Sequence, residues 1–327
     1  MTIQARVGGT PDVNRVSSDL TFSIVIETDN LEIADLDALR ACLQSLGEQP
    51  ALQRAAGAFL VDGGELPDEA FGVFHRDFPW LTIVRAEPGT AYIALKARGA
   101  SLSKSDVIIF CDSDVRYESG WLDALLSGFR QRPEAQIVCG ETTTPIHGPY
   151  SLAFALTFNF PRFTGERALV PCAMYWANNV AIRRSLIEQA PIPDPAALYR
   201  GQNLVHGAEL ARRGLTIWRQ PTARAVHIVI PPGEIARRYM ILGRDSATLA
   251  RLGRDRSGCS PLAAMPPDRS EHGQVAKLLA RVRQVVRANP RHAALLPLAA
   301  PIVACLVACY FAGKLLPVVT PRPSEIT

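Results

Sequence analysis

Residues 107–115 read VIIFCDSDV and decide the fold: the apolar residues Val107 to Cys111 are followed at once by the acids Asp112 and Asp114. A continuous apolar run bounded by polar residues is typical of a strand that is buried on both faces of a parallel sheet. The two acids then lie just past its carboxyl end, the edge at which open α/β sheets bind ligands. The stretch therefore predicts a buried central strand and a candidate site together.

The flanking sequence alternates short apolar runs with helical patterns. Such alternation is typical of strand-helix-strand units and predicts an α/β, Rossmann-like fold, a mostly parallel sheet flanked by helices. Strands are expected at 22–26, 58–61, 81–84, 107–111 and 136–139, and helices at 35–47, 91–104 and 120–131. A second block at 172–229 is expected to hold a helix in AIRRSLIEQ, a helix end in GAELARRG and a final strand at 225–230.

Between these blocks, residues 141–171 are rich in Thr, Pro, Phe and Gly. This segment is expected to form an acceptor-side insertion or a loop that contacts a membrane. After the second block, Pro231-Pro232-Gly233 marks a change to a basic helical stretch.

Composition limits the class of protein. The 327 residues, 48% of them hydrophobic, can bury one large core or two modest ones. The net charge of +4 is small and dispersed, so nucleic acid is not the expected partner. The cysteines show no CxxC or Cys/His spacing, which argues against a zinc site or a disulfide framework and favours a reducing, cytosolic compartment.

The C-terminal part predicts contact with a membrane. Residues 293–313 are uncharged and apolar over the length that a helix needs to span a bilayer. The alternatives are a buried core helix or a re-entrant one bent at Pro297 and Pro301. The basic residues before it mark a cytoplasmic flank by the positive-inside rule; they are Lys277, Arg281, Arg283, Arg287 and Arg291.

These patterns predict an organisation in four parts. Residues 1–20 lack the pattern of a secretory signal and are expected to be a flexible arm. Residues 21–230 form the expected catalytic domain, 231–292 a basic amphipathic interfacial segment, and 293–327 a transmembrane helix with a short tail. We expect a protein of the cell membrane whose catalytic domain faces the cytoplasm.

Asp112 and Asp114 form an Asp-Xaa-Asp motif at the expected strand end. Two carboxylates in this position can hold a divalent cation that bridges to a diphosphate and offsets its negative charge. The alternative is a pair of loop acids that cap the helix opened by YESGW at 117–121.

Residues 22–227 resemble the family 2 glycosyltransferases of GT-A fold. SIVIETDNL at 23–31 is similar to the family's opening strand and loop, and FLVDGG at 59–64 to its nucleotide-holding second strand. Residues 91–115 resemble the helix, strand and metal motif, and WANNVAIRRSLI at 176–187 the acceptor-side strand and helix. The resemblance implies a nucleotide-sugar donor such as a UDP-hexose, Mg²⁺ or Mn²⁺, and an inverting transfer to a lipid or saccharide acceptor at the membrane.

The resemblance assigns roles to particular residues. The implied nucleotide-sugar ligands are Thr28, Glu27, Asp62, Lys96 and Asp112; the metal ligands are Asp112, Asp114 and His227; the acceptor-side residues are Trp176, Asn178 and Asn179. Glu27 replaces the family's usual proline. The alternatives are that Asp62 only forms a turn with the glycines after it, and that His227 is structural.

The largest departure from the family lies in RGQNLVHGAELARRG at 200–214. Where the family has an acidic pair whose Asp serves as the general base, this chain has Gln202 and Asn203. A carboxamide has no basic lone pair near neutral pH. Three explanations stay open: His206, Glu209 or Glu141 acts instead; the acceptor is already anionic, as a polyprenyl phosphate is; or the protein binds without catalysis.

GEIARRYMILGRD at 233–245 resembles the QxxRW segment of membrane-bound members, with Glu234 in place of Gln. Arg237 and Arg238 are the candidates to clamp the diphosphate. The alternative is an interfacial helix whose arginines face lipid headgroups.

We expect a glycosyltransferase, and two other classes remain as alternatives. One is a non-catalytic nucleotide-sugar-binding protein, because of Asn203. The other is a nucleotidyltransferase, although the Gly-rich basic loop of that class does not follow the first strand. A dinucleotide-binding enzyme is disfavoured because GxGxxG does not follow that strand either.

Overall fold

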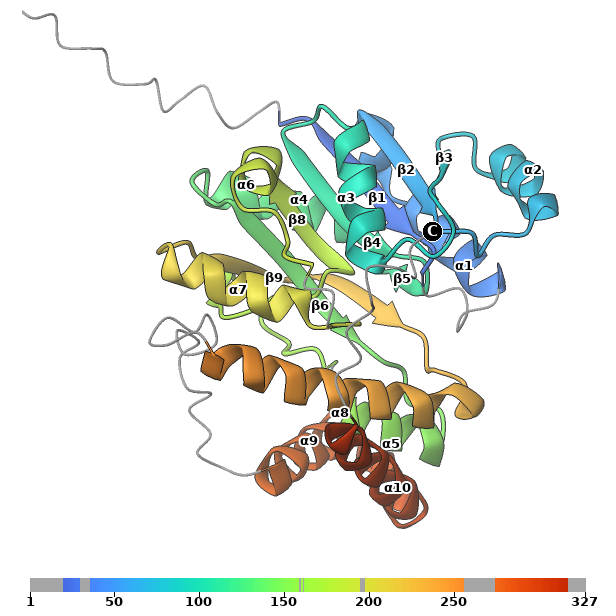
Figure 1. Cartoon of the computed structure of the whole chain (residues 1–327), viewed down its shortest axis with the longest axis vertical. Helices are drawn as coiled ribbons and strands as arrows, with labels where there is room; N and C mark the ends of the chain where they lie inside the picture. Colours follow the sequence, from blue (N-terminus) through green and yellow to red (C-terminus); the bar gives the residue numbers. More distant parts are fainter. Residues whose placement is uncertain are drawn as a thin grey trace, which may run out of the picture.

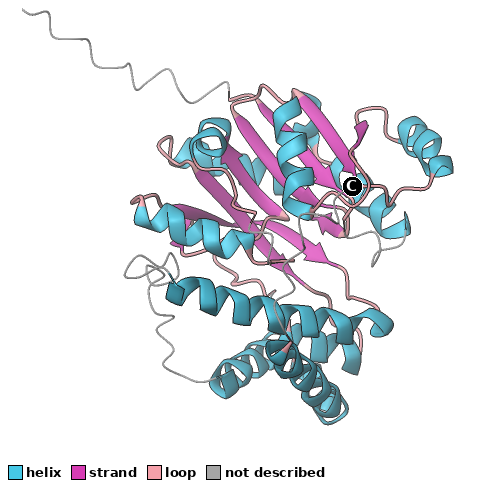
Figure 2. Ribbon diagram, in the orientation of Figure 1, coloured by secondary structure: helices cyan, strands magenta, loops and turns pink. Residues whose placement is uncertain are grey.

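A computed structural model of the chain describes residues 20–29, 36–158, 160, 162–194, 198–255 and 274–316. Most of the arm expected at 1–20 and the tail after 316 lie outside the described residues. A nine-stranded sheet with the order β3-β2-β1-β4-β8-β6-β9-β5 forms the centre, and β7 pairs with β9. Figures 1 and 2 show helices packed on this sheet and a second group of helices below it.

The first half of the sheet is parallel, as predicted. Its strands are β1 (Phe22–Glu27), β2 (Gly57–Asp62), β3 (Thr82–Arg85) and β4 (Val107–Asp112), with β1 between β2 and β4. Every residue of β1 and β4 is buried, which explains their continuous apolar sequences. The helices α1 (Leu36–Gly47), α2 (Asp68–Asp77), α3 (Tyr92–Leu102) and α4 (Trp121–Gln131) complete this half. The predicted α/β class is confirmed.

The second half of the sheet is mixed, where a mostly parallel sheet was predicted. β8 (Asn179–Arg183) runs antiparallel to both β4 and β6 (Ile137–Thr143), and β6 runs parallel to β9 (Ile217–His227). β5 (Val115–Tyr117) and β7 (Val170–Cys172) are antiparallel to β9. Because the chain turns directly from β4 into β5, the pair Val115–His227 brings the end of β9 to the end of β4.

A second group of helices lies on one side of the sheet. Its members are α5 (Pro149–Thr157), α8 (Pro232–Asp255), α9 (Gln274–Ala288) and α10 (Leu296–Leu315), and they share an apolar core. The segment 141–171, expected as an insertion or loop, therefore contains the end of β6, helix α5 and strand β7. α5 is apolar on all sides and packs against α10, so it shows no amphipathic period.

The remaining helices are α6 (Arg184–Gln189) and α7 (Gln202–Arg212), with short 3₁₀ turns at Pro50–Arg54 and Pro290–Leu295. The helical stretch Pro290–Leu315 is long and apolar enough to cross a membrane, with a mean hydropathy of 2.2. Length and composition alone support that property. α10 also packs along α8, which follows directly on β9 and so belongs to the body of the protein.

Candidate active site

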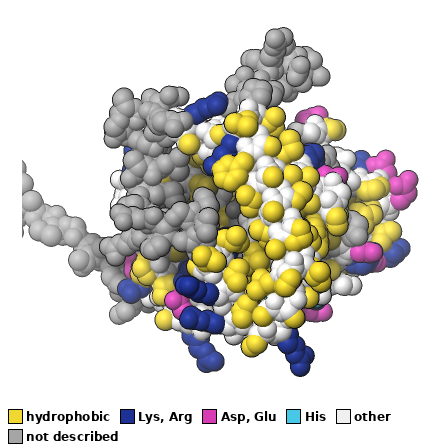
Figure 3. Space-filling view, turned by 90° about the horizontal axis from the view of Figure 1, so that it is seen from below, with side chains coloured by type: hydrophobic (Ala, Val, Ile, Leu, Met, Phe, Trp, Pro, Cys, Tyr) yellow, Lys and Arg dark blue, Asp and Glu magenta, His cyan; other side chains and the backbone are white. Residues whose placement is uncertain are grey.

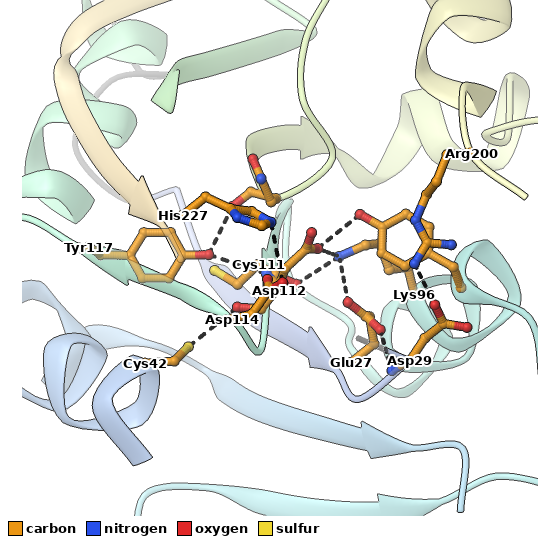
Figure 4. A network of polar contacts seen from close by, with 12 residues as sticks. Glu27, Asp29, Cys42, Lys96, Cys111, Asp112, Asp114, Tyr117, Arg200 and His227 are labelled. Atoms are coloured by element: carbon orange, nitrogen blue, oxygen red, sulfur yellow. Dashed lines mark hydrogen bonds and ion pairs between the residues drawn. The ribbon is translucent and has the colours of Figure 1, made fainter. Parts of the chain in front are cut away.

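The strand ends of β1 and β4 carry a buried charge cluster, shown in Figure 4. Lys96, fully buried on α3, places Nζ 2.7 Å from Asp112 Oδ1 and 2.7 Å from the Cys111 carbonyl oxygen. The Tyr92 hydroxyl donates to the same carboxylate oxygen over 2.9 Å. Asp112 therefore has its charge balanced and its Oδ1 hydrogen-bonded within the protein.

Glu27 completes this cluster from β1, where its register partner on β4 is Asp112. Its Oε1 lies 3.9 Å from Lys96 Nζ, and its Oε2 accepts a hydrogen bond from the Asp29 backbone N–H over 2.7 Å. Burial raises the pKa of Glu27 well above its usual value, more than the nearby Lys96 ammonium lowers it. This carboxyl thus replaces the family's usual proline with a group that faces Lys96.

Asp114 and His227 face each other across the turn from β4 to β5. His227 Nε2 lies 3.2 Å from Asp114 Oδ2, and both side chains are almost fully buried. His227 Nδ1 is 2.6 Å from the Ile228 carbonyl oxygen, which only accepts, so Nδ1 carries the hydrogen and the ring is oriented. Asp114 Oδ1 is buried and has no hydrogen-bond partner within the described part of the chain.

The directions of the two pKa shifts agree with an interaction between Asp114 and His227. Burial favours neutral Asp114, but the His227 imidazolium outweighs it, so the pKa of Asp114 lies below its usual value. Burial likewise favours neutral His227, but the Asp114 carboxylate raises its pKa. Each group of the pair thus favours the charged form of the other.

Two arginines approach Asp114 from α8 and from the loop before α7. Arg238 is 8% exposed, and its Nε and Nη1 have no hydrogen-bond partner among the described residues. Its guanidinium lies over the Tyr199 ring at 4.9 Å, and that of Arg200 lies over the same ring at 4.1 Å. Burial lowers the pKa of Arg238, and the neighbouring Arg200 charge lowers it further. Two like charges held this close suit an anionic ligand.

Arg200 is held in place by two carboxylates. Its guanidinium pairs with Asp29, and its backbone N–H donates to Asp245 Oδ2 over 2.8 Å. Asp245 lies on α8 seven residues, about two helical turns, after Arg238, so the same face of α8 carries both contacts. Arg200, Tyr199 and Asp29 could not be predicted from the sequence as site residues, because they lie in irregular segments without a recognisable period.

At the end of β2, Asp62 and Thr28 lie side by side as the resemblance implied. The Thr28 hydroxyl is 3.1 Å from Asp62 Oδ1 and 2.6 Å from Glu65 Oε2. Asp62 Oδ1 also accepts from the Leu66 backbone N–H, as in a turn, while its buried Oδ2 has no hydrogen bond within the described residues. Arg85 Nε is 3.8 Å from that oxygen. Turn formation therefore uses only one of the two oxygens.

The expected acceptor-side residues divide into two kinds. Asn179 is fully buried, accepts from Trp121 Nε1 and donates to the carbonyl oxygens of Glu141 and Ala223, so its amide is used within the core. Asn178 accepts from the Thr142 hydroxyl. The Trp176 ring is half-buried and meets the Phe160 ring edge-on at 5.2 Å. The Asn179 amide thus links three elements of the core, and its predicted place on the acceptor side stays a prediction.

The ring of Phe160 also lies 4.8 Å from the His227 ring, so one side of the Asp114–His227 pair is aromatic. These rings belong to the apolar core shared by α5, α8 and α10.

The candidate replacements for the general base are engaged elsewhere. His206 is buried between the Tyr175 hydroxyl, 2.6 Å from Nδ1, and the Ala190 carbonyl, 3.0 Å from Nε2; burial lowers its pKa to about 4. Glu209 pairs with Arg212 and Arg213 on the surface of α7. Glu141 accepts from Thr164 and lies 3.4 Å from Arg219. The structure therefore brings none of these three to the Asp114–His227 pair.

Asn203 and Arg237 also have partners. The Asn203 amide nitrogen donates to the Tyr175 carbonyl oxygen at the start of α7. Arg237 is exposed and pairs with Glu234 at 3.2 Å, so it does not share the buried position of Arg238. Of the two arginines expected to clamp a diphosphate, only Arg238 is directed inward.

The pair Asp114 and His227 fits a divalent cation better than Asp112 does. Asp114 offers a buried carboxylate oxygen that has no hydrogen-bond partner among the described residues, and His227 directs Nε2 toward the same carboxylate. Asp112 Oδ1, in contrast, is used by Lys96 and Tyr92. The described residues contain no group of three or more His, Cys, Asp or Glu side chains placed to hold a metal. A cation there would need further ligands from the substrate or water.

Comparisons with known proteins agree with this geometry. The sequence pattern of the family described as Glycosyl transferase family 2 matches residues 23–189, just over half of the chain. No curated protein matches the sequence. A crystal structure of GalNAc-T7 with UDP, GalNAc and Mn²⁺ is similar in fold, with a TM-score of 0.54 and 13% identity over 73% of this chain. This chain spans about half, 51%, of that protein.

The matched segment contains the parallel half of the sheet, the Asp-Xaa-Asp motif and β8. The chain therefore belongs to glycosyl transferase family 2 and is a glycosyltransferase built on the GT-A fold.

Proposed function

We propose that the protein transfers a hexosyl group from a UDP-sugar to an acceptor at the cell membrane, with inversion and with the help of Mg²⁺ or Mn²⁺. The observation that carries the proposal is the Asp114–His227 pair together with Arg238, whose buried Nε and Nη1 have no hydrogen-bond partner among the described residues. The attacking acceptor oxygen forms a bond to the anomeric carbon as the bond from that carbon to the diphosphate breaks, and nucleoside diphosphate leaves.

The donor is proposed to lie across the carboxyl ends of β1, β2 and β4. Asp62 Oδ2, which accepts no hydrogen bond from the described residues, is proposed to accept one from the ribose or the base at the end of β2. Lys96 fixes Asp112 between the nucleoside and the diphosphate. Arg238 offers two donors to the diphosphate oxygens, and a guanidinium matches such oxygens geometrically.

Asp114 and His227 are the residues proposed to hold the divalent cation. A bound cation would offset the charge that develops on the leaving diphosphate. His227 would hold the cation through Nε2 as a neutral imidazole, because Nδ1 carries the hydrogen that is donated to the Ile228 carbonyl oxygen. The GalNAc-T7 structure, which is similar in fold and contains UDP and Mn²⁺, supports this proposal.

The acceptor is proposed to be anionic, of the polyprenyl phosphate kind. The position of the family's base is Asn203, and the three candidate replacements are engaged elsewhere. A phosphate oxygen needs no deprotonation at neutral pH, so an anionic acceptor removes the need for a base. Arg200 and Arg238 supply positive charge, and the rings of Phe160 and Trp176 supply an apolar wall.

A donor screen by released nucleotide tests the proposal. Purified full-length protein is incubated with UDP-hexoses and either polyprenyl phosphate, a neutral polyprenol or a saccharide, with metal omitted as control. We expect transfer to the phosphate alone, dependent on metal and lost in Asp114→Ala. Transfer only to hydroxyl acceptors would exclude the anionic acceptor and leave the donor assignment standing. The anomeric configuration of the product, read by NMR coupling, tests inversion.

Asn203→Asp is the companion variant. With a phosphate acceptor, a second negative charge beside the acceptor should lower transfer, whereas with a hydroxyl acceptor the new carboxylate should raise it. A non-catalytic nucleotide-sugar-binding protein is the second candidate, supported by Asn203; it predicts UDP-sugar binding without turnover for any acceptor.

We further propose a location at the cell membrane with the catalytic domain, residues 21–230, facing the cytoplasm. The support is the apolar helix α10 and the basic residues of α9 before it.

A further inference from the structure

Helix α10 is joined to α8 by direct contact between backbones. A Cβ added to Gly243 of α8 would lie 1.9 Å from the Tyr310 carbonyl oxygen, and one added to Gly313 of α10 would lie 1.9 Å from the Met240 carbonyl oxygen. The Tyr310 hydroxyl donates to Ser246 Oγ over 2.8 Å. Met240 thus faces Gly313 and Ser246 faces Tyr310, so the helices are antiparallel and lie side by side.

Helix α8 cannot follow α10 into hydrocarbon. It carries Arg238, Arg244 and Asp245, and Asp245 is bonded to Arg244 and to the backbone of Arg200 at the active site. Ionised side chains are costly at the centre of a bilayer. α8 therefore stays in the aqueous part of the protein. Because α10 packs along α8, α10 is not positioned to span the membrane by itself.

The side of α10 that faces away from α8 is exposed and apolar. Ala299, Leu306 and Gly313, seven residues apart, are its buried stripe. On the other side, Leu298 is 63% exposed, Phe311 50% and Leu315 86%. Every exposed residue between Pro297 and Leu315 is apolar. Figure 3 shows this face as a band of hydrophobic side chains with Lys and Arg side chains at its borders. A continuous exposed apolar band indicates an interaction site.

Basic residues border this band. Arg283, Arg287 and Arg291 are exposed on α9 and the turn that precedes α10. An apolar face bordered by arginines is complementary to an anionic lipid surface, whose headgroups attract the arginines while the acyl chains accept the apolar side chains.

We infer that α10 lies in the plane of the membrane interface, with its exposed face immersed among the lipids of an anionic bilayer, and does not span the membrane. The opposite side of α8 carries Arg238 and Asp245, so α8 separates the bilayer from the diphosphate site by one helix. The inference concerns attachment and does not depend on the proposed transfer reaction.

The first test measures binding of the full-length protein to vesicles of phosphatidylcholine with and without phosphatidylglycerol, by flotation. The double variant Leu298→Glu/Phe311→Glu should weaken binding by at least about 100-fold, because two apolar side chains that contact the lipid are replaced by charged ones. Leu102→Glu is the matched control, since Leu102 is an exposed leucine of α3 and should have no effect. An unchanged Tm for each variant shows that folding is intact.

The triple variant Arg283→Ala/Arg287→Ala/Arg291→Ala should weaken binding to anionic vesicles by about 100-fold, since each arginine near such a surface adds about fivefold. Binding to pure phosphatidylcholine should change little. If the α10 variants instead convert a dimer to a monomer and leave vesicle binding unchanged, the face binds a second copy and the inference is wrong.

The second test separates lying in the interface from spanning. A tag is added after Thr327, and membrane vesicles with the cytoplasmic side outward are treated with protease. An in-plane helix leaves the tag on the same side as the catalytic domain, so both are digested. A spanning helix protects the tag inside the vesicle, and a protected tag would overturn the inference.

Discussion

The two acids of the Asp-Xaa-Asp motif have opposite surroundings although one residue separates them. Around Asp112, Lys96 and Tyr92 satisfy the carboxylate at normal hydrogen-bond distances. Around Asp114, one oxygen lacks a partner among the described residues, and so do two nitrogens of Arg238. Buried polar atoms are normally paired, so a cluster of unpaired ones marks where a ligand binds. We propose that Asp112 is a supporting residue and that Asp114 faces the ligand.

The variant Asp114→Ala tests the difference between the two acids most directly and has the largest expected effect. We expect kcat/KM to fall about 1000-fold, since the carboxylate proposed to hold the cation is lost. Metal-dependent release of nucleotide from UDP-sugar measures the change. Asp112→Asn keeps a side chain that Lys96 and Tyr92 can still contact and should cost less. Equal losses in the two variants would contradict the division into support and binding surface.

Lys96→Met should destabilise the fold while Arg238→Met should not. Removing Lys96 leaves Asp112 and Glu27 buried without their cation, which costs about 3 kcal/mol in the free energy of unfolding. Urea denaturation measures this. Arg238 has unpaired nitrogens, so its loss removes no hydrogen bond from them, and the free energy of unfolding should stay within about 1 kcal/mol. A stable Lys96→Met protein would show that the support is dispensable.

Arg238→Ala and Arg237→Ala form a matched pair on neighbouring residues. Arg238→Ala should lower kcat/KM for the UDP-sugar about 30-fold, the effect of losing charge-assisted hydrogen bonds worth about 2 kcal/mol. Arg237 is exposed and pairs with Glu234, so Arg237→Ala should leave kcat/KM within about twofold. The opposite order would place the diphosphate on the outer face of α8.

The smallest expected effect is on the pH dependence of stability without metal. The lowered pKa of Asp114 contributes stability that is lost as pH falls through the folded pKa, and the raised pKa of His227 contributes stability that is lost as pH rises through its folded pKa. The pair should therefore stabilise most between the ordinary values 3.8 and 6.5. The contribution of the pair is measured by comparing Tm as a function of pH for the wild type and for His227→Asn. Parallel curves would show that the Asp114–His227 pair does not contribute to stability.

Local pattern predicted the parallel half of the fold and its motif well. The run at 107–111 and its neighbours encode buried strands by composition alone, so β1, β2 and β4 appear where expected. The mixed half was not predictable in this way. Whether β8 runs parallel or antiparallel to β4 depends on the path of the chain through residues 141–178, which has no period, and α5 is apolar on all sides.

The residues of the candidate site also fall into a predicted group and a group that could not be predicted. Asp114, His227 and Arg238 were found from the resemblance, and the structure places them together. Arg200 was not found, because it reaches the site through Asp29 and Asp245, which are distant in sequence. His206 and Glu209 were proposed from proximity to Asn203 in sequence. His206, three residues after Asn203, lies on a neighbouring position of α7 but is held in the core by Tyr175 and Ala190, and Glu209, six residues after Asn203, points to the solvent-facing arginines.

The glycine contact between α8 and α10 restricts how the C-terminal helix can be exchanged. Any side chain at Gly243 or Gly313 meets a carbonyl oxygen of the other helix, so only a partner of matching shape fits. A generic hydrophobic anchor grafted in place of residues 293–327 would keep the protein at a membrane yet lose the surface against which α8 rests. The terminal helix is therefore a folding partner of the active-site helix, and a chimera that ignores this should be membrane-bound and inactive.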